Sequence, residues 1–258
     1  MHALLDFAKW TRRAGNPVQA PVPELRDAQL AACYYDHRVG GDCYEFMRVS
    51  PTRVFFALFD VAGRIEENRP VVTAVQNVFR TTTAQLFSRD DVNEADAMVE
   101  LCLELNRTIL ETADHVCSTP AFAGCYNESL GTVSYFNAGH TPGLLADDGQ
   151  VIELRATGLP LGLFSHATPD ASIVALQPGD ALVVVSRGIV EARHRRQEFG
   201  LDPVKKNLQQ ARMENATEIC AGILDTLREF TSRPSAENDI TVVALSRQAA
   251  AAAAGAGN

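Results

Sequence analysis

The amino-acid sequence predicts an α+β fold in which helices cover antiparallel sheets. Strand-like and helix-like segments come in groups along the chain rather than in strict alternation, which is typical of α+β domains. Short turn sequences, such as Asp-Asp-Gly-Gln at 147–150, separate neighbouring strand patterns, and such turns join antiparallel strands. The segment 53–61 is almost entirely apolar, which favours a central strand buried on both faces.

The first half of the domain is expected to contain three strands and then two helices. The strands cover residues 29–38, the segment after the Gly-Gly turn at 40–41, and residues 53–61. Asn68 and Pro70 suit the cap and first turn of a helix that continues to about residue 87. Asp91, with Glu94 three residues later, resembles the capping box of the second helix.

The second half is dominated by strands. Residues 121–140, 142–154 and 171–186 each contain two apolar runs around a turn, which predicts three consecutive hairpins. A helical region follows at about 202–232, and residues 238–246 predict a closing strand. Consecutive hairpins imply antiparallel sheets.

The chain divides into an N-terminal arm or linker at residues 1–24, one domain at residues 25–247, and a low-complexity tail at residues 248–258. The arm is rich in proline and the tail is mostly alanine, and neither composition predicts a regular element of the core. Because 46% of the 258 residues are hydrophobic, the chain can bury a sizeable core.

Composition and charge argue against several classes of protein. The formal net charge of −9 disfavours binding to nucleic acid or to anionic membranes. The six cysteines form no CxxC pair, so neither a disulfide framework nor a zinc site is expected. No apolar run approaches the ~20 residues of a membrane span, and the N-terminus lacks a signal-peptide pattern. The sequence therefore predicts a cytoplasmic protein that binds neither nucleic acid nor membrane, and it leaves a homodimer open.

Two aspartates lie where a predicted strand meets a glycine turn, namely Asp42 after Gly41 and Asp60 at the end of the apolar strand. Burying an acid is costly unless it binds something, and two carboxylates can bind a hard divalent cation. Capping of the local turn is an equally ordinary role. His140, in "NAGHTP", lies at another strand end, where hydrogen bonding to its own turn is the ordinary role. Arg187 follows the apolar run 181–185 at a turn that is well suited to an acid.

Seven motifs occur in a fixed order along the chain, and together they carry more information than any one of them. They read "GGDCYEF", "FALFDVAG", "NAGHTP", "GLPLGLF", "LQPGDALVVVSRGIVEA", "EFG" and "NDIT". This ordered set resembles the metal-dependent PPM-type protein phosphatases, in particular the branch that resembles sporulation stage II protein E. The resemblance covers about residues 25–247.

The resemblance implies a four-layer αββα sandwich of two antiparallel sheets flanked by helices. In such phosphatases, aspartates at one edge of the sandwich hold a pair of Mn²⁺ or Mg²⁺ ions ~3.5–4 Å apart, which activate a water for attack on phosphoserine. The usual partners are phosphorylated anti-anti-sigma proteins of the STAS type, in the regulation of sigma factors. The expected cofactor is therefore Mn²⁺ or Mg²⁺ if the protein is active.

The resemblance also assigns metal-binding positions. It places metal ligands at Asp42, at Asp60 and at the backbone carbonyl of Val61, and it places family aspartates where this chain has Arg187 and Asn238. A one-residue change of register would bring Asp239 to the last of these positions. The other residues that match motifs near the site are Gly41, Gly63, His140 and Gly188.

Arg187 and Asn238 remove two of the four expected carboxylates, and Arg187 adds a positive charge, so an ordinary two-metal site is not expected. The guanidinium can pair with Asp60 or Asp42, or it can extend into solvent. Three interpretations follow for the whole protein. It is an impaired phosphatase that acts as a binding or regulatory module without metal, an active phosphatase with a rearranged metal site, or a structural subunit that assembles through the arm.

Overall fold

The computed structural model describes residues 22–35, 41–63, 65–166, 168–210, 215–231 and 239–249. Of the predicted arm only residues 22–24 are described, and of the predicted tail only residues 248–249. Residue 238, one of the two altered ligand positions, lies outside the described residues, and so does residue 64 in the loop after Asp60.

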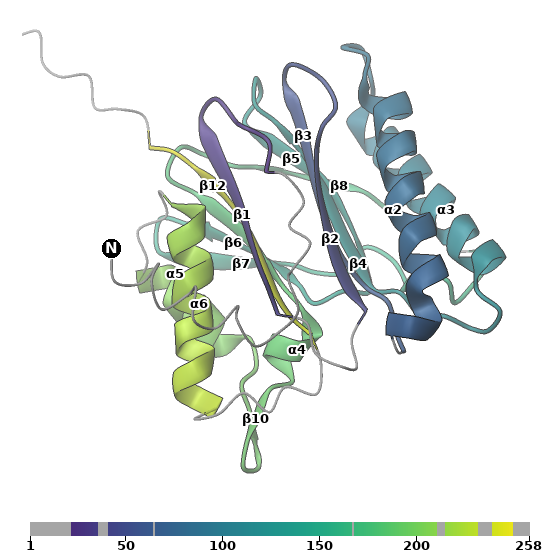
Figure 1. The fold of residues 1–258 in the computed structure, drawn as a ribbon. Coiled ribbons are helices and arrows are strands. Elements are labelled where there is room, and N and C mark those ends of the chain that lie inside the picture. The colour runs from purple at the N-terminus through teal and green to yellow at the C-terminus, as the bar shows by residue number, and fades with distance from the viewer. Residues whose placement is uncertain are drawn as a thin grey trace, which may run out of the picture.

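Two sheets pack face to face at the centre of the described part of the chain (Figure 1). The first, here called the β1 sheet, has the spatial order β1 (Ala28–Tyr35), β12 (Ile240–Arg247), β9 (Ala181–Val185), β6 (Gly143–Asp147) and β7 (Gln150–Leu154). The second, here called the β2 sheet, has the spatial order β2 (Asp42–Arg48), β3 (Arg53–Asp60), β4 (Ala121–Asn127), β5 (Thr132–Ala138) and β8 (Ser172–Ala175). Every pairing between these strands is antiparallel.

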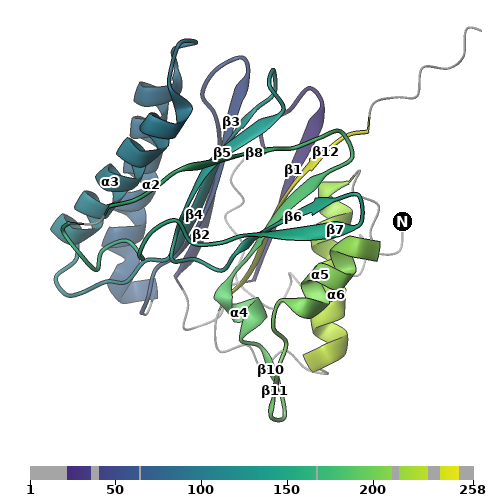
Figure 2. The same cartoon turned by 180° about the vertical axis from the view of Figure 1, so that it is seen from behind.

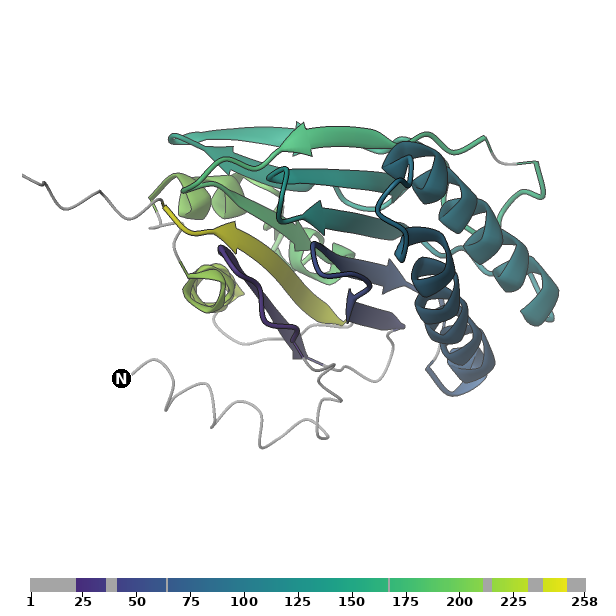
Figure 3. The same ribbon diagram turned by 90° about the horizontal axis from the view of Figure 1, so that it is seen from above.

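Helices cover the outer face of each sheet (Figures 1 and 3). The helices α2 (Ile65–Phe87) and α3 (Glu94–Thr112) lie on the β2 sheet, whereas α5 (Asp202–Gln210) and α6 (Ala216–Thr231) lie on the β1 sheet. A short helix, α4 (Arg187–Val190), follows β9 and leads into a small hairpin of β10 (Arg193–His194) and β11 (Gln197–Glu198). The four-layer αββα sandwich expected from the sequence is therefore confirmed.

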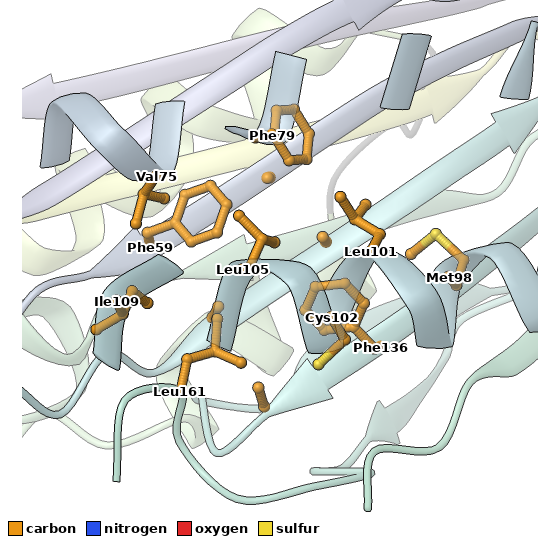
Figure 4. Packing of buried hydrophobic residues seen from close by; sticks show 14 of the residues in the cluster. Phe59, Val75, Phe79, Met98, Leu101, Cys102, Leu105, Ile109, Phe136 and Leu161 are labelled. Atoms are coloured by element: carbon orange, nitrogen blue, oxygen red, sulfur yellow. The ribbon is translucent and has the colours of Figure 1, made fainter. Parts of the chain in front are cut away.

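Three apolar clusters fill the three interfaces between the four layers. One lies between the β1 sheet and α5 and α6, one between the two sheets, and one between the β2 sheet and α2 and α3 (Figure 4). The continuous apolar run noted in the sequence forms strand β3. All residues of this strand are buried, so neither of its faces can be polar throughout. Its odd-numbered residues from Phe55 to Phe59 face the helices, and its even-numbered residues from Val54 to Leu58 face the other sheet, as the two-residue period of a strand requires.

One of the three predicted hairpins is wrong. The first two correspond to β4–β5 and β6–β7, but β8 and β9 do not pair with each other. Strand β8 pairs with β5 in the β2 sheet, whereas β9 pairs with β6 and β12 in the β1 sheet. The connection 176–180 therefore crosses from one sheet to the other, and each strand finds its partner through long-range packing.

The predicted helix starts also need correction. Helix α2 begins at residue 65, so Pro70 lies inside the helix. The Asn68 side chain donates a hydrogen bond back to the carbonyl of Ala62 at 2.5 Å. Helix α3 is capped by Asn93, whose side-chain oxygen accepts hydrogen bonds from the two amides at residues 95 and 96. Asparagine and aspartate are comparable N-caps, so local preference alone does not choose between Asp91 and Asn93.

No helix among the residues that the structure describes is both long enough and apolar enough to cross a lipid bilayer.

A buried ion pair ties the start of β3 to helix α3, at the end of the strand opposite to Asp60. The Nε of Arg53 donates to Glu94 Oε1 at 2.6 Å, and both side chains are less than one-tenth exposed. The carboxylate of Glu94 also accepts hydrogen bonds from Asn127 at 2.7 Å and Ser134 at 2.8 Å. One carboxylate therefore joins β3, β4 and β5 to α3.

We expect Arg53→Met to lower the free energy of unfolding by about 3–5 kcal/mol, because it leaves the Glu94 carboxylate buried without its cation. Denaturant titration followed by circular dichroism measures this change. The matched control is Arg89→Met, which removes an exposed ion pair with Asp91 and is expected to leave stability unchanged. Equal unfolding midpoints for Arg53→Met and the wild type would contradict the role assigned to this pair.

Candidate functional site at one edge of the sandwich

Asp42 and Asp60 lie directly opposite each other at one edge of the β2 sheet. Asp42 is the first residue of β2 and Asp60 is the last residue of β3, and the register of these two antiparallel strands pairs them. Side chains of directly opposed residues project from the same face, so the two carboxylates share one small volume. The structure therefore brings together the two aspartates that the sequence singled out.

Residues of the β1 sheet meet Asp42 at this edge. The side-chain Oδ2 of Asp239, which immediately precedes β12, accepts a hydrogen bond from the backbone amide of Asp42 at 3.1 Å and one from the Tyr34 hydroxyl at 3.3 Å. The hydroxyl of Thr241 donates to Asp42 Oδ2 at 2.6 Å. Asp42 thus links β2 to β12 across the gap between the sheets, and Asp239 reaches the site.

Arg187 completes the cluster with a positive charge. Its Nε lies 3.3 Å from Asp60 Oδ2, the side chain of Asp60 is 10% exposed, and that of Arg187 is 49% exposed. Of the two alternatives for this side chain, the ion pair is therefore the one observed, and its partner is Asp60 rather than Asp42. Half of the guanidinium side chain remains in contact with solvent.

Ser186 explains how Arg187 comes to this position. The backbone amide of Ser186 donates to the carbonyl of Thr241 at 2.9 Å. Its hydroxyl donates to the carbonyl of Asp239 at 3.1 Å and accepts from the amide of Thr241 at 3.0 Å. These bonds fasten the end of β9 to the start of β12, so the next residue, Arg187, begins α4 at the edge where Asp60 ends.

Burial disturbs the ionisation of both aspartates. Burial, and then repulsion from Asp60, raises the pKa of Asp42 well above its usual value, although the hydrogen bond from Thr241 opposes the shift. Burial also raises the pKa of Asp60, whereas Arg187 lowers it and the nearby Glu191 raises it further. Negative charge is therefore unfavourable at this edge, and Arg187 offsets only part of it.

His140 is buried beside the same edge as a neutral ring. Burial lowers the pKa of His140 to about 4. Its Nδ1 lies 3.2 Å from the carbonyl of Thr141 and 3.0 Å from the Thr141 hydroxyl, which itself donates to the carbonyl of Val185. Both neighbours therefore accept from Nδ1, which carries the proton. The Nε2 lone pair has no hydrogen-bond partner within the described part of the chain.

The remaining motif residues shape the backbone around the site. A Cβ on Gly41 would lie 2.0 Å from the carbonyl oxygen of Val61, so only glycine permits this close approach. The amide of Val61 donates to the carbonyl of Gly41 at 3.1 Å, which joins the residue before β2 to the residue after β3. Gly63 follows in the loop with a φ of +112°, and Gly188 is buried in α4.

The residues at this edge do not fit the two-metal centre that the family resemblance implies. No group of three or more histidine, cysteine, aspartate or glutamate side chains is arranged to hold a metal ion among the residues that the structure describes. The guanidinium of Arg187 pairs with the carboxylate of Asp60, which the resemblance assigns as a metal ligand. The carboxylate of Asp42 already accepts a hydrogen bond from Thr241, and its backbone amide donates to the carboxylate of Asp239.

The sequence interpretation missed two side chains that organise the site, Thr241 and Ser186. Alternation along a strand places residues 239 and 241 on one face, so the pattern contained a signal for Thr241. No comparable signal exists for Ser186, because its three hydrogen bonds depend on the pairing of β9 with β12.

Two antiparallel sheets packed face to face, with aspartates at one common edge, define the class of PPM-type phosphatase folds. Residues 50–248 match the family described as Stage II sporulation protein E (SpoIIE). The chain therefore belongs to this family, and the resemblance inferred from the ordered motifs is confirmed.

Two named relatives are each less than a quarter identical to this chain. The chain is 22% identical to protein IcfG of Synechocystis sp. over 94% of its own length and 42% of that protein. It is 23% identical to phosphoserine phosphatase RsbU of Bacillus subtilis over 82% of its own length and 60% of that protein. The chain thus spans less than two thirds of each of these proteins.

A solved structure supports the fold. The RsbU and RsbW domains of Rv1364c from Mycobacterium tuberculosis match 91% of this chain and 65% of that chain, with a TM-score of 0.72 and 23% identity. This similarity concerns the fold.

We expect Asp42→Asn to stabilise the protein at neutral pH in the presence of a chelator. Because the pKa of Asp42 is raised from 3.8 on folding, the folded state binds more protons than the unfolded state above that pH, and stability falls as pH rises. Asparagine does not ionise, so the substitution removes this dependence of stability on pH. Its side-chain oxygen can still accept the hydrogen bond from Thr241. Thermal unfolding at several pH values measures the effect, with the exposed Asp225→Asn as control. A loss of stability confined to neutral pH would contradict the predicted sign.

Proposed function

We propose that this domain is a catalytically impaired PPM-type phosphatase that acts as a binding or regulatory module in cytoplasmic bacterial signalling. The observation that carries the proposal is the ion pair between Arg187 Nε and Asp60 Oδ2, at 3.3 Å. A guanidinium lies where the family resemblance expects a metal-binding aspartate, and it already pairs with Asp60, to which the resemblance assigns the role of a metal ligand.

The magnitude of charge repulsion supports this proposal. A divalent cation held by Asp60 would face the guanidinium at a similar distance. Repulsion between charges of +2 and +1 at about 4 Å amounts to roughly 8 kcal/mol with an effective dielectric constant of about 20. Arg187 would therefore have to leave Asp60 before an ion could bind, and its half-exposed side chain would have to lie fully in solvent.

The proposed partner is a phosphorylated protein of the STAS type, the class to which anti-anti-sigma proteins belong. Support comes from the family, because the relative RsbU is described as a phosphoserine phosphatase. A domain that retains this fold but holds no catalytic metal can still recognise such a partner through the same edge. It would then sequester the phosphorylated form or position it for another protein.

One observation favours a second candidate function, an active Mn²⁺- or Mg²⁺-dependent phosphoserine phosphatase with a rearranged metal site. Asp42 lies opposite Asp60 and its amide is bonded to Asp239, so carboxylates outnumber the single guanidinium of Arg187 here, although no described group of three is arranged to hold a metal ion. Repulsion from Asp60 and Asp239 contributes to the raised pKa of Asp42, and a cation would relieve it.

We expect the purified protein to hydrolyse p-nitrophenyl phosphate and a phosphoserine peptide no faster with Mn²⁺ than with EDTA. The physical reason is the repulsion between Arg187 and any ion at Asp60. Release of phosphate measures the rate, and Asp60→Asn reports the background of contaminating phosphatase. A Mn²⁺-dependent rate above that of Asp60→Asn would establish the second candidate function instead.

We expect Arg187→Asp combined with Asn238→Asp to gain Mn²⁺ binding in isothermal titration calorimetry, whereas the wild type shows none. The two changes restore the carboxylates that the family resemblance places there and remove the opposing cation. The matched control, Arg89→Asp with Asn93→Asp, makes the same change of charge at the far end of the β2 sheet, where aspartate can still cap α3. No gain of binding in the first variant would refute the idea that these two residues block a metal site.

A further inference from the structure

A small hairpin extends from the domain beside the candidate site. Strands β10 and β11 are joined by a two-residue turn of Arg195 and Arg196, and the hairpin protrudes beyond the sheets and helices in Figures 1 and 2. Its base is bonded to the segment of α4, because Phe199 donates to Ala192 at 2.8 Å and Gly200 donates to Val190 at 2.9 Å. The hairpin is therefore attached to the element that begins with Arg187.

Aromatic contacts hold the base of this hairpin on helix α6. The ring of His194 lies 6.0 Å from that of Phe230, and the ring of Phe199 lies 5.3 Å from it. Both pairs have edge-to-face geometry, which is favourable for aromatic rings at these distances. The base is thus anchored while the turn is exposed.

The turn presents positive charge that has no partner in the described chain. Arg193 forms an ion pair with Glu198 across the hairpin. Arg195 and Arg196 are exposed, and neither forms an ion pair with any residue that the structure describes. These two exposed arginines thus protrude from a chain whose formal net charge is −9.

The backbone of this turn favours a different residue. Arg195 has a φ of +58°, and within the described residues the only other non-glycine residue with positive φ is Asp148. Glycine is the preferred residue at the first position of such a two-residue hairpin turn. The chain therefore carries an arginine where glycine would be more stable, and a strained position of this kind points to function.

We propose that the hairpin Arg193–Glu198 is the docking element through which this domain binds an acidic segment of its protein partner. This inference deepens the proposed function, on which it rests, by naming the surface and the charge of the partner. Charge complementarity favours a short acidic peptide, which touches the arginine turn alone. An extended polyanion such as a nucleic acid or an anionic membrane would also meet the acidic remainder of the surface.

Fluorescence anisotropy tests the proposal with a labelled peptide of alternating glutamate and serine. The 258-residue chain is expected to bind it, with an affinity that falls as salt is added. Arg195→Gly with Arg196→Gln is expected to weaken binding about tenfold, while its thermal midpoint stays equal or rises. The matched control, Arg89→Gln with Arg107→Gln, removes the same charge from the α2–α3 side and is expected to bind like the wild type.

Three results would overturn the proposal. They are absence of binding by the wild type, equal binding by the hairpin variant, and tighter binding of a single-stranded oligonucleotide or of phosphatidylserine vesicles than of the peptide. Because the peptide carries no phosphate and the assay contains EDTA, binding is measured independently of hydrolysis. Mn²⁺-dependent phosphatase activity would therefore refute the proposed loss of catalysis without removing the docking result.

Discussion

The ion pair between Arg187 and Asp60 joins the ends of the two sheets and sets the electrostatics of the whole edge. Asp60 ends β3 in the β2 sheet, whereas Arg187 follows β9 in the β1 sheet. The carboxylates of Asp42, Asp60 and Asp239 lie close together at this edge, and burial raises the pKa of Asp42 and of Asp60. The guanidinium supplies counter-charge from within the chain, where the family resemblance expects metal ions from outside.

Hydrogen bonds around this pair hold the ends of the two sheets together at the edge. Thr241 and Asp239 reach Asp42 across the sheets, and Ser186 locks the two strands that lead to Arg187 and Asp239. These contacts use backbone groups and neutral hydroxyls as well as carboxylates, so they do not need a metal ion to form. In the function proposed above, this edge serves as the recognition surface.

The arginine hairpin extends the same edge into solvent. Its strands continue from α4, so Arg187, which pairs with Asp60, and the two exposed arginines of the turn belong to one continuous segment, 187–198. In an otherwise acidic chain, this arginine-rich segment places positive charge on one side of the molecule. A partner that is steered by charge would meet the hairpin next to the edge that holds Asp42 and Asp60.

The sequence by itself determined the class of fold and the strand that is buried on both faces, and it predicted two positions at which the expected ligands are altered. These features depend on local alternation, on turn residues and on the order of motifs, which are all properties of neighbouring residues. Only the tertiary structure decided that β8 and β9 belong to different sheets and that Arg187 pairs with Asp60 rather than Asp42. Both outcomes depend on which strands, distant in the sequence, lie next to each other in space. The packing of the whole domain sets these neighbours, and local sequence patterns do not encode them.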